Sequence, residues 1–113
     1  MNTEYKVDED GTEYWYKDGK LHRDGDEPAV IEADGTRWWY KDGKLHRNGD
    51  EPAIIDKYTK YWYKDGKPYR DGDEPTVIRG NGQKEWYKNG VHIEMWMELN
   101  VEYPIEPVAL CRF

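Results

Sequence analysis

The sequence is poor in cysteine and in long apolar runs, with Cys111 as its single cysteine among 113 residues. One cysteine cannot form an internal disulfide, so the chain does not fit a disulfide-stapled secreted scaffold, and a reducing compartment is the default. No window approaches the roughly 18 apolar residues of a membrane helix, and the first residues carry neither a basic start nor an apolar segment. We therefore expect a cytoplasmic protein without a membrane partner.

An excess of positive charge is also absent, because the formal net charge is -7. Acidic residues predominate toward both ends of the chain, and the middle is mildly basic. Surfaces that bind nucleic acid are normally basic, so nucleic acid is not the expected ligand. Acidic ends fit a protein partner with a basic surface better.

No group of residues predicts catalysis, a metal or a cofactor. His22 and His46 lie near carboxylates, but they recur at equivalent positions, whereas an active site needs one asymmetric set of groups. The repeated acidic Asp-Gly-Asp-Glu segments lack the twelve-residue spacing of a calcium loop and its closing glutamate. The sequence therefore predicts a protein that is not an enzyme and binds no cofactor or metal.

What the sequence does contain is a repeat. The segment WYKDGKLHRDGDEP begins at Trp15, WYKDGKLHRNGDEP at Trp39 and WYKDGKPYRDGDEP at Trp62, and the pattern returns in part at Trp86. These tryptophans are 24, 23 and 24 residues apart, and a fixed period of this length is typical of stacked-repeat proteins. Ten tyrosines and six tryptophans supply most of the large apolar surface, which favours a thin structure.

Asp-Gly and Asn-Gly pairs divide each copy into short strands. The first set of pairs begins at Asp18, Asp42, Asp65 and Asn89, and a second set begins at Asp34 and Asn81. These residues tolerate the positive φ of tight hairpin turns, and no stretch has a 3.6-residue period. We predict an all-β fold, an antiparallel meander sheet built from tandem β-hairpin repeats with about three strands per copy.

We expect one repeat domain with atypical ends. Its parts are residues 1–113 as the whole, 1–12 as a partial N-terminal repeat, 13–90 as the tandem repeats and 91–113 as a C-terminal cap. From Val91 to Tyr103 apolar and polar residues alternate, which predicts one long strand with an apolar face. Repeat arrays need such an end to cover the last unit.

The repeated unit WYKDGKLHRDGDEPAVI resembles the tandem repeats common in bacteriophage and giant-virus proteins, which are similar to the variant MORN (membrane occupation and recognition nexus) repeat. The resemblance covers roughly residues 3–90 and departs from the repeat at Pro68 and Tyr69, where the other copies have Leu-His. It implies an elongated, twisted β-sheet that acts as a binding platform. The aromatic runs are also similar to choline-binding repeats of bacterial surface proteins, but the KLHRDGDEP half is dissimilar.

Stacking the copies turns each repeated residue into a column across the sheet. Trp15, Trp39, Trp62 and Trp86 form one column, which we expect to be core. Tyr16, Tyr40, Tyr63 and Tyr87 form a second column on the opposite face, joined by Tyr14, Trp38 and Tyr61. Exposed aromatic rings are typical of protein contacts. Columns of lysine and arginine beside columns of aspartate and glutamate are expected to compensate one another.

These features predict a non-catalytic protein-binding module, encoded by a phage or virus, that engages or inhibits a host protein, for example as an anti-defence or anti-CRISPR type inhibitor. The expected partner-binding residues are Glu94, Trp96, Glu98, Glu102, Tyr16, Tyr40 and Tyr63. Two alternatives stay open at this point. One is a sponge for a small ligand or nucleotide held on the aromatic face. The other is a structural, self-assembling module that forms a homodimer through the C-terminal strand.

Overall fold

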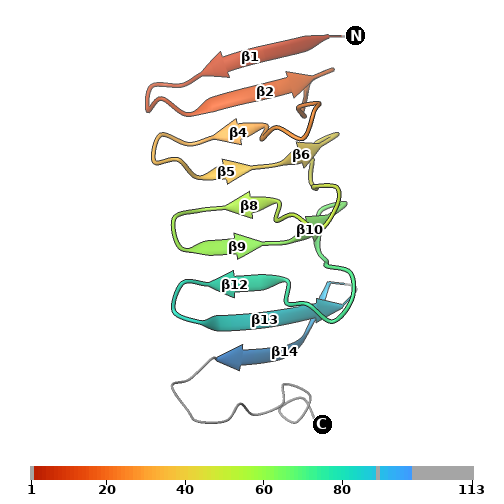
Figure 1. Ribbon diagram of the computed structural model, residues 1–113. Coiled ribbons are helices and arrows are strands. Elements are labelled where there is room, and N and C mark those ends of the chain that lie inside the picture. Colours follow the sequence, from red (N-terminus) through yellow and green to blue (C-terminus); the bar gives the residue numbers. More distant parts are fainter. Residues whose placement is uncertain (1, 89, 98–113) are drawn as a thin grey trace.

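Aromatic runs separated by Asp-Gly turns fold into a ladder of short strands, which Figure 1 shows in a computed structural model of the chain. The structure describes residues 2–88 and 90–97, and of residues 93–97 the backbone alone. Within those residues every regular element is a β-strand and every pairing is antiparallel. The molecule is elongated, 52 × 27 × 20 Å, and the prediction of an all-β antiparallel meander is confirmed.

The main sheet follows the chain from one end to the other. Its order is β1 (Thr3–Val7), β2 (Glu13–Lys17), β4 (Val30–Ile31), β5 (Arg37–Trp38), β8 (Ile54–Ile55), β9 (Thr59–Tyr61), β12 (Val77–Arg79), β13 (Gln83–Lys88) and β14 (Val91–Met97). Because neighbours in the sheet follow one another in sequence, the copies lie along the long axis of the molecule in the order of the sequence (Figure 1).

The turns between paired strands of the main sheet are held by the residues that the sequence places there. The Asp34 carboxylate accepts a hydrogen bond from the Thr36 N–H at 2.9 Å, and the Asn81 amide oxygen accepts one from the Gln83 N–H at 2.9 Å. Gly35 has φ of 95°, a conformation that costs glycine least. Local side-chain acceptors and glycine therefore close these hairpins.

A second set of strands forms small hairpins beside the main sheet. These are β3 (Lys20–Leu21) against the end of β2, β6 (Tyr40–Lys41) with β7 (Lys44–Leu45), and β10 (Tyr63–Lys64) with β11 (Lys67–Pro68). We call them the side hairpins. The central residues Asp42 and Gly43 have φ of 51° and 83°, the two positive angles that a tight hairpin turn requires. The Gly43 N–H donates to the Leu21 carbonyl at 2.9 Å and the Gly66 N–H to the Leu45 carbonyl at 2.8 Å, so adjacent side hairpins are joined.

The side hairpins differ from the single continuous meander of about three strands per copy that the sequence predicted. In the second and third copies Trp39 and Trp62 each lie between a strand of the main sheet and a strand of a side hairpin. The Trp39 N–H donates to the Ala53 carbonyl in the main sheet, and its carbonyl accepts from the His46 N–H in the loop that follows the side hairpin. Two strands of each of these copies lie in the meander, and the remaining ones pair beside it.

The core is a thin row along the sheet. The buried residues that the structure describes are Pro28, Ala29, Val30, Thr36, Trp39, Pro52, Ala53, Ile54, Trp62, Pro75, Thr76 and Val77. Trp39 and Trp62 are 5% and 6% exposed, which confirms the expectation that the central tryptophans are core. Trp15 and Trp86, at the two ends of that column, are half-buried because they have a neighbouring copy on one side only.

The C-terminal strand β14 pairs with β13 with a shift in register. Tyr87 lies opposite His92 and Trp86 opposite Glu94, so Ile93 between them has no partner in β13. A β-bulge of this kind interrupts alternation, so the predicted uninterrupted period of two is wrong at this point. The rest of the predicted cap, residues 98–113, lies outside the described residues.

Candidate functional site

Three of the predicted partner-binding residues lie at equivalent places. Tyr16, Tyr40 and Tyr63 stand near the ends of β2, β6 and β10, and each is half-buried. Each pairs across a side hairpin with an apolar residue, as Tyr40 does with Leu45. The repeat therefore brings these tyrosines to the same edge of the molecule in each copy.

The other predicted residues fall at the C-terminal end. Glu94 and Trp96 lie on β14, opposite Trp86 and Lys84 of β13 in the backbone register. Glu98 and Glu102 are outside the described residues, so their grouping with Glu94 and Trp96 stays a prediction.

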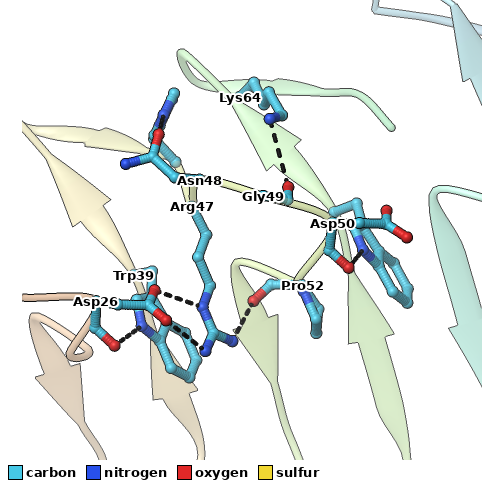
Figure 2. Close-up of polar contacts among 10 residues, drawn as sticks. Asp26, Trp39, Arg47, Asn48, Gly49, Asp50, Pro52 and Lys64 are labelled. Carbon is cyan, nitrogen blue, oxygen red and sulfur yellow. Dashed lines mark hydrogen bonds and ion pairs between the residues drawn. The ribbon is translucent and has the colours of Figure 1, made fainter. Parts of the chain in front are cut away.

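The tryptophan–arginine face is formed by Trp15, Trp39 and Trp62 with Arg23, Arg47 and Arg70. Figure 2 shows its second copy, in which the Arg47 guanidinium lies 3.8 Å from the centre of the Trp39 ring. Arg47 donates to the Pro52 carbonyl at 3.1 Å and to both carboxylate oxygens of Asp26 at 2.9 and 3.3 Å. The Trp39 indole N–H donates to the Asp26 carbonyl at 3.1 Å. Asp26 belongs to the preceding copy, so this cluster joins two copies.

The third copy repeats this arrangement. Arg70 lies 3.9 Å from the Trp62 ring centre and donates to the Asp50 carboxylate at 2.8 and 3.2 Å. The hydrogen bond from Arg70 lowers the pKa of Asp50 below its ordinary value. The arginines are thus compensated by carboxylates of the previous copy, as the charge columns predicted.

The ladder of arginine and aspartate is open at both ends. Arg23 stacks on Trp15 at 3.7 Å and donates to the Pro28 carbonyl, but among the described residues it pairs with no carboxylate. At the other end, Glu94 occupies the sequence position that arginine has in the earlier copies, so no described arginine reaches the Asp73 carboxylate. Within residues 2–88 and 90–97, a complete cluster is present in the second and third copies alone.

The repeated histidines join the side hairpins. His22 Nδ1 accepts from the Asp42 N–H at 3.0 Å, and His46 Nδ1 accepts from the Asp65 N–H at 3.0 Å. The opposite ring nitrogen of His46 lies 2.9 Å from the Asn48 side-chain oxygen. Because Nδ1 accepts, Nε2 carries the proton and donates. Both histidines therefore help to hold neighbouring copies together.

The tyrosine face is formed by Tyr14, Trp38 and Tyr61 together with Tyr16, Tyr40 and Tyr63. Cross-strand pairs align Tyr14 with Val30, Val30 with Trp38, Trp38 with Ile54, Ile54 with Tyr61 and Tyr61 with Val77. Directly paired side chains share one face of a sheet, so aromatic and aliphatic residues alternate along this row. Burial raises the pKa of Tyr40, and burial with the nearby Tyr61 and Tyr87 raises that of Tyr63.

The N-terminal end of the tyrosine face contains a hollow of about 340 Å³, which we call the N-terminal hollow. Its lining residues are Asp8, Asp10, Thr12, Tyr14, Leu21, Val30, Glu32, Trp38 and Tyr40. The Tyr14 hydroxyl donates to Asp8 at 3.0 Å, and the Trp38 indole N–H donates to the Glu32 carboxylate. Several hydrogen bonds lower the pKa of Asp8, and the bond from the Thr12 N–H has the largest effect. Asp8 therefore stays ionised near neutral pH. Aromatic surface and negative charge therefore meet at one place.

Sequence reasoning did not single out Asp8 and Glu32. A signal was present, because both begin the turn that precedes the aromatic run of their copy, at the position held by Asp56 and Arg79 in the later copies. In the fourth copy Arg79 forms an ion pair with Glu85 at 2.6 Å, in place of the contact between carboxylate and aromatic ring. The tyrosine face thus changes along the molecule. At the N-terminal end carboxylates contact aromatic side chains, and in the fourth copy Arg79 and Glu85 form an ion pair instead.

Comparison with known proteins finds no matching family model, curated protein or solved structure. Residues 2–88 and 90–97 contain no group of three or more histidine, cysteine, aspartate or glutamate residues that could hold a metal ion. Nor does this part of the chain contain a helix long and apolar enough to cross a membrane.

Proposed function

We propose that the chain is a non-catalytic protein-binding module whose tyrosine face engages a protein partner with a basic surface. In this proposal the array consists of tandem β-hairpin repeats of about 24 residues with a cap at residues 91–113. The observation that carries it is the N-terminal hollow, where aromatic rings and carboxyl side chains line one concave surface.

The chemistry of the N-terminal hollow matches a lysine or arginine side chain. Its apolar stem would lie against Trp38 and Tyr40, and its charge would face Asp8 and Glu32. A cation over an aromatic ring gains about 0.5–1 kcal/mol at exposed sites, and a nearby carboxylate adds to that attraction. Several such contacts along a flat aromatic face give the clustered aromatic anchors that are typical of protein interfaces.

The opposite face supports this choice by contrast. On the tryptophan–arginine face, Arg47 and Arg70 donate to neighbouring carboxylates and carbonyls, and Trp39 and Trp62 are buried. These groups are already satisfied within the molecule, so they offer a partner little to bind.

The resemblance to phage and giant-virus repeats gives the proposal its biological setting. On that basis the partner is a host protein in the cytoplasm, and the module acts by occupying its working surface, as an anti-defence inhibitor does. In addition to the tyrosines, we propose a second contact region at the C-terminal end of the chain. It consists of Glu94, Trp96, Glu98 and Glu102.

The experiment is affinity capture from bacterial lysate, followed by binding measurements with the purified captured protein. The test variant combines Asp10→Lys and Tyr40→Ala, two residues that line the N-terminal hollow and make no described side-chain hydrogen bond. The matched control is Glu27→Lys, an exposed charge reversal outside the hollow. We expect a discrete protein that the parent and the control retain, that the test variant loses, and whose binding weakens with added salt.

A second variant separates the two proposed regions. Trp96→Ala with Glu98→Lys and Glu102→Lys changes the C-terminal region alone. Loss of the partner from this variant and not from the first would move the interface to the C-terminal end. Equal retention by both variants, each shown to be folded by circular dichroism, would refute the protein-binding proposal at either place.

A further inference from the structure

The side hairpins place lysines directly opposite one another. The register pairs Lys17 with Lys20, Lys41 with Lys44 and Lys64 with Lys67. Like charges directly opposite in an antiparallel pair are destabilising. The three copies repeat this unfavourable pair, so positive charge is concentrated along the side hairpins at a cost in stability.

The third side hairpin also departs from the repeat, with Pro68 and Tyr69 where the earlier copies have leucine and histidine. His22 and His46 each accept a hydrogen bond at Nδ1 from a backbone N–H of the next side hairpin, as described above. Tyr69 instead donates its hydroxyl to Asp71 in its own loop, and its side chain is 39% exposed. A large aromatic ring is therefore presented to solvent beside the lysines of this hairpin alone.

A groove of about 650 Å³ lies at this departure, which we call the lysine groove. Lys44, Lys64 and Lys67 line it together with Pro68 and Tyr69. Small-molecule sites commonly measure about 300–1,000 Å³, so the groove has room for a ligand of nucleotide size.

Most of the positive charge in the lysine groove is uncommitted. Lys44 and Lys67 form no ion pair with any residue that the structure describes, and Lys64 donates to the Gly49 carbonyl at 3.4 Å (Figure 2). The stem of Lys44 packs on the next hairpin, where a Cβ at Gly66 would lie 3.7 Å from the Lys44 Cβ. Lys44 belongs to the second side hairpin and lines the groove at the third.

Two carboxylates also line the groove. Asp71 accepts the Tyr69 hydroxyl, and Asp65 lies 3.5 Å from His46 Nδ1. Three lysines and two aspartates leave one net positive charge in the lining. The aspartates therefore weaken the attraction for an anion without reversing it.

We propose that the lysine groove binds a nucleotide, with its phosphates at Lys44, Lys64 and Lys67 and its base stacked on Tyr69. Lysine acts as a point charge toward phosphate and tolerates varied geometry, which suits three flexible side chains around one groove. Stacking of a base on an aromatic ring needs only an exposed ring face, which Tyr69 supplies. This site shares no lining residue with the N-terminal hollow.

Isothermal titration calorimetry of the whole chain with three probes tests the proposal: ATP, adenosine and tripolyphosphate. ATP should bind more tightly than either part, because it uses the lysines and Tyr69 together. Lys44→Gln and Lys67→Gln should each weaken ATP binding about tenfold, the effect of losing one charge-assisted contact. Tyr69→His, which restores the residue of the other copies, should weaken ATP binding and leave tripolyphosphate binding unchanged.

Two further variants make the test specific to this groove. Lys20→Gln changes the equivalent of Lys44 in the first copy, outside the groove, and should leave ATP binding within about twofold of the parent. Asp71→Asn keeps an acceptor for Tyr69, removes one negative charge and should strengthen ATP binding. ATP that binds no more tightly than tripolyphosphate, or an equal loss from Lys20→Gln and Lys44→Gln, would reduce the site to diffuse lysine charge and overturn the proposal.

Discussion

The two faces of the sheet use their repeated aromatic residues in opposite ways. On the tryptophan–arginine face, Trp39 is 5% exposed and its N–H, its ring and the Arg47 guanidinium above it all have partners inside the molecule. On the tyrosine face, Tyr16 and Tyr40 stay half-buried, and their hydroxyls form no hydrogen bond with any described residue. Folding thus uses the polar groups of the tryptophan–arginine face, whereas on the tyrosine face it leaves the Tyr16 and Tyr40 hydroxyls without a described partner.

The copies differ along the chain as well as across the sheet. The cluster of tryptophan, arginine and aspartate is complete only where a preceding copy supplies the aspartate, as Asp26 does for Arg47. Arg23 lacks that partner among the described residues, although its local sequence is nearly identical. Comparing Arg47 with Arg23 therefore separates what the neighbouring copy contributes to stability from what the local sequence contributes.

The largest effect that we predict is the loss of a complete cluster. Arg47→Ala removes the stacking on Trp39 and the hydrogen bonds to Pro52 and Asp26, and should lower the free energy of unfolding by about 3 kcal/mol. Chemical denaturation followed by tryptophan fluorescence measures this change.

Arg23→Ala is the matched control for Arg47→Ala. It removes a stacking contact and a carbonyl hydrogen bond but no carboxylate contact, so it should cost about 1–2 kcal/mol. Equal losses from the two variants would mean that the contact between Arg47 and the Asp26 carboxylate contributes nothing to stability.

The next effect concerns the histidines between side hairpins. His46→Phe keeps an aromatic ring at this position but loses the hydrogen bonds to the Asp65 N–H and the Asn48 side chain. It should lower the free energy of unfolding by about 1–2 kcal/mol. Tyr69→Phe at the equivalent position loses only an exposed bond to Asp71 and should cost about 0.5 kcal/mol or less. Thermal unfolding of both variants tests the ranking, and a larger loss from Tyr69→Phe would contradict the bridging role of His46.

The sequence was sufficient to predict the all-β class and the antiparallel meander, but not the contacts of Arg47 and Arg70 between copies. Asp-Gly pairs such as Asp42-Gly43 prescribe their own backbone conformation, so the hairpins follow from local sequence. The stacking of Arg47 on Trp39 could not be predicted in this way, because it depends on a loop returning to the ring eight residues back. The separation of the side hairpins from the main sheet likewise depends on how the strands pair in the folded chain.

The N-terminal hollow shows the same limit for the candidate site. The tyrosine column was visible in the repeat, and the structure places Tyr16, Tyr40 and Tyr63 at one edge as that column requires. Asp8 was missed because it belongs to the partial first copy, and its contact with Tyr14 depends on how tightly that turn closes. The residues that differ between copies, rather than those that are repeated, therefore mark the candidate sites.

The pH dependence of stability provides a smaller test of the complete cluster. The pKa of Asp50 is lowered in the folded state by Arg70, so its contribution is present above the unfolded-state value of about 3.9 and is lost as the pH falls through the lowered value. Asp50→Asn should therefore reduce stability at pH 7, and its difference from the parent should shrink below about pH 4.

Denaturation at pH 7 and pH 3 measures this difference for Asp50→Asn. Asp73→Asn changes the equivalent aspartate that no described arginine reaches, and its free energy of unfolding at pH 7 should stay close to that of the parent. A deficit of the same size in both variants at pH 7 would show that the carboxylate acts without its arginine.

The smallest effect is expected on the tyrosine face. Tyr40→Phe keeps the ring and removes a hydroxyl that bonds to no described residue, so the free energy of unfolding at pH 7 should change by about 0.5 kcal/mol or less. Burial raises the pKa of Tyr40 in the folded state, so the stability linked to its protonated form is present below the unfolded-state value of about 10 and is lost as the pH rises through the raised value. The phenylalanine variant escapes that loss and should become more stable than the parent in strongly alkaline solution. Denaturation at pH 7 and above pH 10 checks both statements, and a large loss at pH 7 would mean that folding uses the tyrosine hydroxyls as fully as it uses the arginines of the other face.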